Sequence, residues 1–226
     1  MANSLRSTAT TNSGTSTTPS VSLPTSGVSG DLLVVAISHN DGTVTVADNN
    51  GATPMTEDYD SGNDAGGLGF AFYTRVITGS EPATLNFNLS TSQRWSITSF
   101  IITGQDASIY DVAISTYDIR LTTTTHTSNS CTTNTDNAWA LAIDTLDSGT
   151  NTFSAGPGGS WVQIATVNAG QPLAVYYLNQ ATAGATGNAS FTSASSGNSL
   201  AMRQFAIKAM VVASTTHHLG LLGIGA

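Results

Sequence analysis

The chain has 226 residues and a mass of 23.1 kDa, and only 9% of its residues are charged. Six Lys and Arg residues against 14 Asp and Glu residues give a formal net charge of −8, which excludes the clustered cations that nucleic acids and anionic membranes bind. No run approaches the roughly 20 apolar residues of a membrane span. Cys131 is the single cysteine, which excludes an intrachain disulfide.

Serine and threonine fill about a quarter of the chain, and with 22 glycines they favour strands and turns over helices. Residues 3–24 are almost purely polar; residues 1–20 are expected to form an extended arm, and the alternative is an edge strand such as residues 20–24. Residues 1–10 lack the apolar run of a signal peptide, so we expect no export by the general secretory route.

Strand patterns begin after this segment. Residues 31–38 form a continuous apolar run, which predicts a strand buried on both faces or at the centre of a sheet. Residues 84–89 alternate, so Leu85, Phe87 and Leu89 share one face. Further strands are expected at residues 43–46, 68–76 and 94–102, and no amphipathic helix of three turns is expected.

The second half repeats this plan at a spacing of about 105 residues. Residues 137–143 match 31–37, residues 172–178 match 68–75, residues 187–192 match 84–89, and residues 200–207 match 95–102. The sequence therefore predicts an all-β, two-sheet β-sandwich of jelly-roll type over residues 21–209, with one shared core. Its half-repeats are residues 28–104 and 134–209, and an apolar tail follows over residues 210–226.

Several segments together resemble a known module. They are residues 30–36, 72–76, 79–84 and 101–104 in the first half, and residues 136–139 and 180–187 in the second. Over residues 21–208 the pattern resembles a β-sandwich module of bacteriophage virion and tail proteins, which also occurs in some bacterial surface proteins. The resemblance implies a lectin-like or jelly-roll fold with a structural or adhesive role. It implies no active-site residue.

The acidic, glycine-rich segment at residues 57–67 is the first candidate site. It is expected to be a loop, and it contains Asp58, Asp60, Asn63 and Asp64 within seven residues. Calcium binds carboxylate and amide oxygens of this kind, although the spacing is not that of an EF-hand. The competing interpretation is a solvated surface loop. We expect no cofactor, with calcium as the alternative.

Two aromatic residues are candidates for a ligand or partner surface. Tyr59 and Trp161 lie in expected loops at equivalent ends of the two halves, where an exposed ring stacks on a sugar. Enzymatic motifs are missing: no Gly-x-Ser-x-Gly elbow occurs, and no phosphate-binding glycine loop precedes a helix. We therefore expect a non-enzymatic protein, with a glycan-acting enzyme as the third-ranked hypothesis.

The C-terminal tail is the last candidate. It contains two adjacent histidines and an apolar terminus: His217, His218, Leu219, Leu221, Leu222 and Ile224. An apolar end of this length is unfavourable in water, so it either docks into a neighbouring subunit, folds back over its own sandwich or stays disordered.

These observations predict a structural protein that self-assembles or decorates a larger particle, such as a phage virion, a tail-like particle or a filament. Its partners would be copies of itself or other particle proteins, with no nucleic acid and no membrane. Assembly in a cytoplasm would place it in a virion or extracellular particle. The alternative hypothesis is a carbohydrate-binding or adhesive module, with or without a dependence on calcium.

Overall fold

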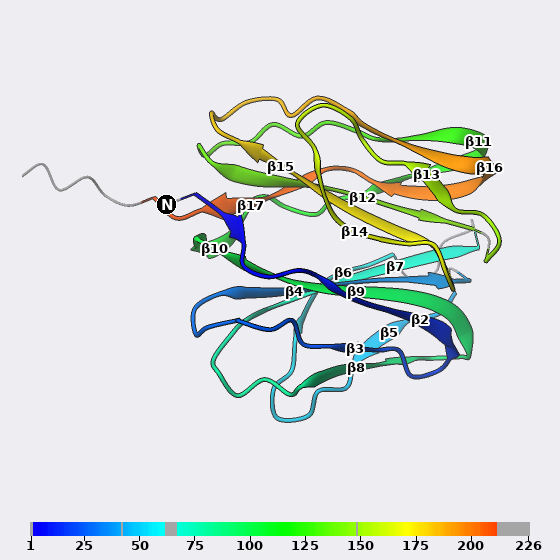
Figure 1. The fold of residues 1–226 in the computed structure, drawn as a ribbon, viewed down its shortest axis with the longest axis horizontal. Helices are drawn as coiled ribbons and strands as arrows, with labels where there is room; N and C mark the ends of the chain where they lie inside the picture. Colours follow the sequence, from blue (N-terminus) through cyan, green and yellow to red (C-terminus); the bar gives the residue numbers. More distant parts are fainter. Residues whose placement is uncertain (1, 42, 62–66, 148, 212–226) are drawn as a thin grey trace, which may run out of the picture.

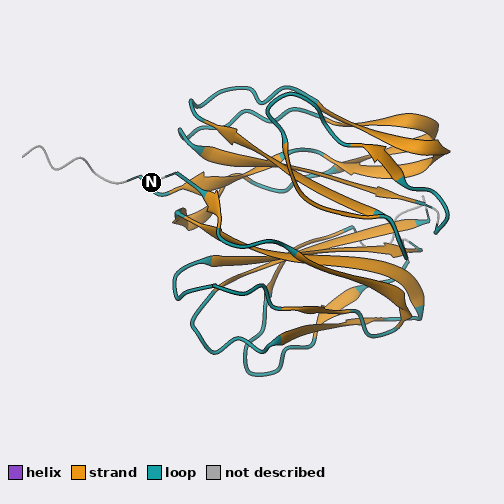
Figure 2. Cartoon of the chain, in the orientation of Figure 1, coloured by secondary structure: helices purple, strands orange, loops and turns teal. Residues whose placement is uncertain are grey.

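The computed structural model describes residues 2–41, 43–61, 67–147 and 149–211, and every helix or strand element in them is a β-strand (Figure 2). The prediction of an all-β protein is confirmed. The strands are β1 (Ser4–Leu5), β2 (Thr10–Ser16), β3 (Ser20–Ser22), β4 (Leu32–Asn40), β5 (Val46–Asp48), β6 (Thr56–Asp60), β7 (Leu68–Val76), β8 (Thr84–Leu89), β9 (Gln93–Thr103), β10 (Gln105–Val112), β11 (Tyr117–Ser128), β12 (Ala138–Leu146), β13 (Phe153–Ala155), β14 (Val162–Val167), β15 (Leu173–Gln180), β16 (Ala189–Met202) and β17 (Phe205–Ala209).

The strands form stacked antiparallel sheets (Figure 1). The N-terminal sheet has the order β1-β9-β4-β7-β6, and β2 also pairs with β9. The C-terminal sheet has the order β10-β17-β12-β15-β14, and β16 connects β12 to β11 and β13. A small outer sheet, β3-β8-β5, covers the far face of the N-terminal sheet. The architecture is therefore consistent with a β-sandwich.

The inner core lies between the N-terminal and C-terminal sheets. Alternate residues of β4 and β7 point into it, and they meet side chains of β12, β15, β16 and β17. One contact is edge-to-face: the rings of Phe72 and Phe205 lie 5.0 Å apart at 78°. This layer joins the two halves of the chain through fully buried side chains.

Each large sheet also packs on its other face. Leu33, Val35 and Ile37 of β4 lie against the outer sheet, so the apolar run of residues 31–38 is buried on both faces as predicted. On the far side of the C-terminal sheet, Ala142 and Ala174 pack against Phe191 of the long strand β16.

Two segments with few apolar residues, one near the N-terminus and one at residues 57–60, form strands. Residues 4–5 and 10–16 belong to the segment expected as an arm, and they form β1 and β2 by pairing with β9. The prediction of a loop is wrong for residues 57–60, which belong to β6 and pair with β7. All three strands have few apolar side chains, and backbone hydrogen bonds to a buried neighbouring strand hold them.

Candidate functional site

The expected calcium ligands are divided between the faces of β6 and a segment outside the described residues. The Thr74 hydroxyl donates a hydrogen bond of 2.6 Å to Asp58, next to the inner core. Asp60 accepts a hydrogen bond of 3.1 Å from the backbone N–H of Val46, on the side of the outer sheet. Asn63 and Asp64 lie outside the described residues. Among the residues that the structure describes, no group of three or more His, Cys, Asp or Glu could hold a metal ion.

The Asp58 carboxyl is also a poor ligand by its environment. Burial raises its pKa, and the hydrogen bond from Thr74 only partly opposes this shift. This partly buried carboxyl already accepts a hydrogen bond from Thr74 of the neighbouring strand β7.

Tyr59 and Trp161 do not form a common surface. Tyr59 lies within β6 instead of a loop, and its half-buried ring contacts Phe70 and Tyr117 at 6.4 Å each beside the inner core. Trp161 precedes β14, as expected for a loop residue, and it packs half-buried against the far face of the C-terminal sheet. The two rings therefore contact different cores.

The tail residues His217, His218, Leu219, Leu221, Leu222 and Ile224 lie outside the described residues. The described chain ends with Met210 and Val211, whose exposed fractions are 43% and 68%. These two residues border the largest hollow described below.

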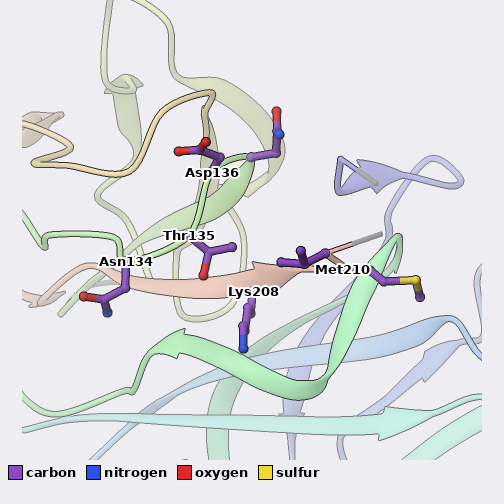
Figure 3. Close-up of a pocket in the computed structure, with 7 residues that line it drawn as sticks. Asn134, Thr135, Asp136, Lys208 and Met210 are labelled. Atoms are coloured by element: carbon purple, nitrogen blue, oxygen red, sulfur yellow. The ribbon is translucent and has the colours of Figure 1, made fainter. Parts of the chain in front are cut away.

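A hollow of about 610 Å³ lies at this end of the molecule (Figure 3). The loop of residues 134–137 forms one wall, and Lys208, Met210 and Val211 form the other. The Asp111 carboxylate shapes the loop, because it accepts hydrogen bonds from the backbone N–H groups of Asn134 at 2.6 Å and Thr135 at 3.3 Å.

A second hollow of about 320 Å³ adjoins the first through Met210. It is lined by Gly30, Val76, Gln105, Asp106 and Ala107 in addition to Met210. Lys208, the only lysine of the chain, places its Nζ 3.8 Å from Asp106 Oδ1 between the two hollows. We call this region the end surface; it comprises Val76, Asp106, residues 134–137, Lys208, Met210 and Val211.

The end surface has the chemistry of a contact surface. Its exposed aliphatic side chains line the same two hollows as a partly exposed ion pair and the polar loop of residues 134–137. An ion pair this exposed contributes little energy, so apolar contact would dominate binding here. Sequence analysis missed Val76 and Asp106, because the fold brings them to the tail from distant segments.

A buried pair escaped prediction as well. His126 Nδ1 lies 2.9 Å from Asp144 Oδ2, and both side chains are completely buried on the far face of the C-terminal sheet. Burial raises the pKa of Asp144, and the hydrogen bond from His126 opposes the shift. The pair lies inside the protein, where both side chains are closed to solvent.

The thiol of Cys131 is likewise unsuited to nucleophilic chemistry. It is buried near Ala138, Ala140 and Ala206, and burial raises its pKa. A nucleophilic cysteine requires a lowered pKa and access to substrate.

Comparisons with known proteins return no relative: no protein-family model matches the chain, and no curated protein or solved structure is detectably similar. No helix long and apolar enough to cross a membrane occurs among the described residues.

Proposed function

We propose that the protein is a non-enzymatic structural subunit that assembles with copies of itself or decorates a larger particle. The observation that carries this proposal is the position of the exposed aliphatic side chains. Val76, Met210 and Val211 are 47%, 43% and 68% exposed, and all three line the hollows of the end surface. They are three of the five large apolar side chains exposed in the described chain.

The chain continues from this surface into its apolar tail. Residues 212–226 would span at most about 50 Å when extended, which is enough to reach a neighbouring subunit. Leu219, Leu221, Leu222 and Ile224 would supply the apolar anchors, and docking would remove them from water. Contacts of this composition depend little on ion pairs, which suits a chain with so few charges.

The type of particle is the more specific part of the proposal. The pattern over residues 21–208 that resembles phage virion and tail modules supports a virion, a tail-like particle or a filament. Such a particle would assemble in the cytoplasm, in keeping with a chain that needs no disulfide.

We also infer that the subunit is an internal duplication. Asn40 pairs with Leu68, and adding 105 to both numbers gives Thr145 and Leu173, which also pair. Both edge strands carry a register shift, between Glu57 and Tyr59 in β6 and between Gln163 and Ala165 in β14. A register shift in the edge strand next to the equivalent hairpin strand of both halves supports a common origin.

Each half has features of a jelly roll. In the first half β2 pairs with β9, β3 with β8 and β4 with β7, which is the nested pairing of a long hairpin that has been folded over. In the second half β11 pairs with β16 and β12 with β15 in the same nested manner. These pairings support two jelly-roll units, one in each half of the chain, that pack against each other across the inner core. The sequence alone predicts a single jelly roll formed by both halves together.

A second candidate function is carbohydrate binding. A hollow of about 200 Å³ near β13 and β14 is lined by Ser154, Gln163, Thr166 and Tyr176 among other residues. Hydroxyl and amide groups beside an aromatic ring are what sugars bind. Binding of the full chain to a glycan array, lost in Gln163→Ala, would favour this candidate.

The assembly proposal is tested by comparing the full chain with a chain that ends at Val211. We expect the full chain to form particles or oligomers by light scattering and electron microscopy, and the shortened chain to lose them. The thermal unfolding temperature should stay unchanged, because the removed residues lie beyond the last described strand. A full chain that remains monomeric, or assembly that survives the truncation, would contradict the proposal.

A further inference from the structure

The C-terminal sheet ends in an edge strand without charge. Among the described residues, β14 pairs only with β15, and its sequence is Val162-Gln-Ile-Ala-Thr-Val167. Val162 is 46% exposed, the fourth of the exposed large apolar side chains. An edge strand presents unpaired backbone N–H and C=O groups, and proteins usually protect such edges with charges or proline. β14 has neither.

The equivalent edge of the N-terminal sheet is protected. Strand β6 reads Thr56-Glu-Asp-Tyr-Asp60 and carries three carboxylates. The equivalence is close: Glu57 lies opposite Tyr73, and Gln163 lies opposite Tyr176. In each pair the tyrosine hydroxyl donates to its partner's side chain, at 3.1 Å and 3.0 Å. One edge therefore carries the negative charge and the other carries none.

The pattern of β14 is self-complementary. Val162, Ala165 and Val167 lie opposite Tyr177, Val175 and Leu173. Gln163 and Thr166 lie opposite Tyr176 and Ala174, whose side chains belong to the far-face core. The strand thus reads apolar, polar, apolar, apolar, polar, apolar, which is the same in both directions.

We propose that β14 is an interface between two copies of this chain, which pair as antiparallel strands about a two-fold axis. The axis lies between Ile164 and Ala165, so Val162 meets Val167 of the second copy. Gln163 then meets Thr166, and Ile164 meets Ala165. Apolar side chains face apolar ones on the inner-core side, and polar ones face each other on the opposite side. This proposal deepens the proposed self-assembly and rests on it.

A second observation supports a copy of the chain as the partner. The Thr166 hydroxyl is buried and has no hydrogen-bond partner among the described residues. Gln163 uses its Oε1 to accept from Tyr176, which leaves its amide N–H groups as donors. Two-fold pairing brings this amide opposite Thr166 of the other copy. The same operation on β6 would place Glu57 opposite Asp60, where like charges repel.

The test compares Val162→Lys with Thr56→Lys in the full chain. These positions precede Gln163 and Glu57 in the two equivalent edges, and both are exposed, so neither lysine has to enter a core. We expect Val162→Lys to weaken self-association by about tenfold or more, because its ammonium would be buried without a partner against Val167. Thr56→Lys should change self-association less than about twofold.

The readouts are molar mass by light scattering and hydrogen exchange of the β14 amides at low and high protein concentration. Support requires concentration-dependent protection of β14 in the wild type and in Thr56→Lys, and its loss in Val162→Lys. An assembled wild type whose β14 amides exchange at the same rate at both concentrations overturns this inference and leaves the proposed function standing. Equal weakening by both lysines also overturns it. A monomeric wild type overturns both proposals.

Discussion

His39 is completely buried in β4, with its ring pressed against the backbone of Gly69. A Cβ atom on Gly69 would lie 1.8 Å from His39 Cε1, so the ring fills the space that any larger residue would need. Its Nδ1 lies 3.2 Å from the carbonyl oxygen of Asp41. Burial lowers the pKa of His39 below its usual 6.5, although nearby carboxylates and carbonyl groups oppose the shift.

This histidine should make folding sensitive to acid. Between pH 6.5 and the lowered folded-state pKa, the unfolded chain binds more protons than the folded chain, so the free energy of unfolding falls as the pH falls. We expect a steeper loss of stability between about pH 7 and about pH 5 in the wild type than in His39→Asn. Urea unfolding across that range measures the difference, and parallel pH profiles would show that His39 does not contribute.

The pair of His126 and Asp144 gives a second prediction at this scale. Asp144→Ala removes the acceptor from His126 Nδ1 inside a core, which should lower the free energy of unfolding by about 3–5 kcal/mol. Replacing both residues by leucine should recover part of this loss, because the polar group that needs a partner is then gone. Chemical denaturation of the two variants tests this. A single-variant loss below about 1 kcal/mol would contradict it.

At the scale of elements, β2 shows that a polar segment can be essential to a sheet. It pairs with β9 in an unbroken register from Thr10 to Ser16. The Trp95 ring lies directly on Gly14, where a Cβ atom would be 2.9 Å from Cζ2, and its Nε1 donates to the Ser16 hydroxyl at 3.0 Å. Without β2, Trp95 and the edge of β9 would meet water.

Deleting residues 2–16 should therefore destabilise the subunit itself. We expect a loss of at least about 3 kcal/mol, equivalent to roughly 6–12 °C in the unfolding temperature of a chain this size, together with a red shift of tryptophan fluorescence. Differential scanning calorimetry and fluorescence measure both effects. A segment that served only contacts between subunits would leave the unfolding temperature of the subunit unchanged.

At the scale of the whole molecule, the inner core makes the halves depend on each other. Phe72 and Phe100 of the N-terminal sheet belong to the same buried cluster as Trp139 and Phe205 of the C-terminal half. If the halves are separated, each exposes an entire apolar sheet face to water. The chain should consequently unfold in one cooperative transition.

This interdependence can be tested with residues 1–104 and 105–226 produced separately. Each half alone should bind a hydrophobic dye or aggregate, and mixing the halves during refolding should restore the near-ultraviolet signal of the whole chain. Two soluble monomers that each unfold cooperatively, with stabilities close to that of the full chain, would contradict the prediction.

Much of the sheet framework follows from local sequence. The apolar runs at residues 31–38 and 137–143 become β4 and β12, and the alternation at residues 84–89 becomes β8 with Leu85, Phe87 and Leu89 buried. These strands were predictable because burial of apolar side chains at a spacing of two is a property of the strand alone. Low charge and the scarcity of helix formers indicated an all-β fold for a different local reason, because threonine favours strands and glycine and serine favour turns.

Only the tertiary structure shows which polar segments are strands, which residues form the end surface and which strands lie at a sheet edge. Residues 10–16 and 56–60 are polar, and only pairing with β9 and β7 makes them strands. The end surface combines Val76, Asp106 and Lys208 from separate parts of the chain, and β14 becomes an edge only because β15 occupies its other side. Local periodicity records which face of a strand is apolar. Which strands lie side by side is set by long-range hydrogen bonds and packing, so edges and composite surfaces are visible only in the folded chain.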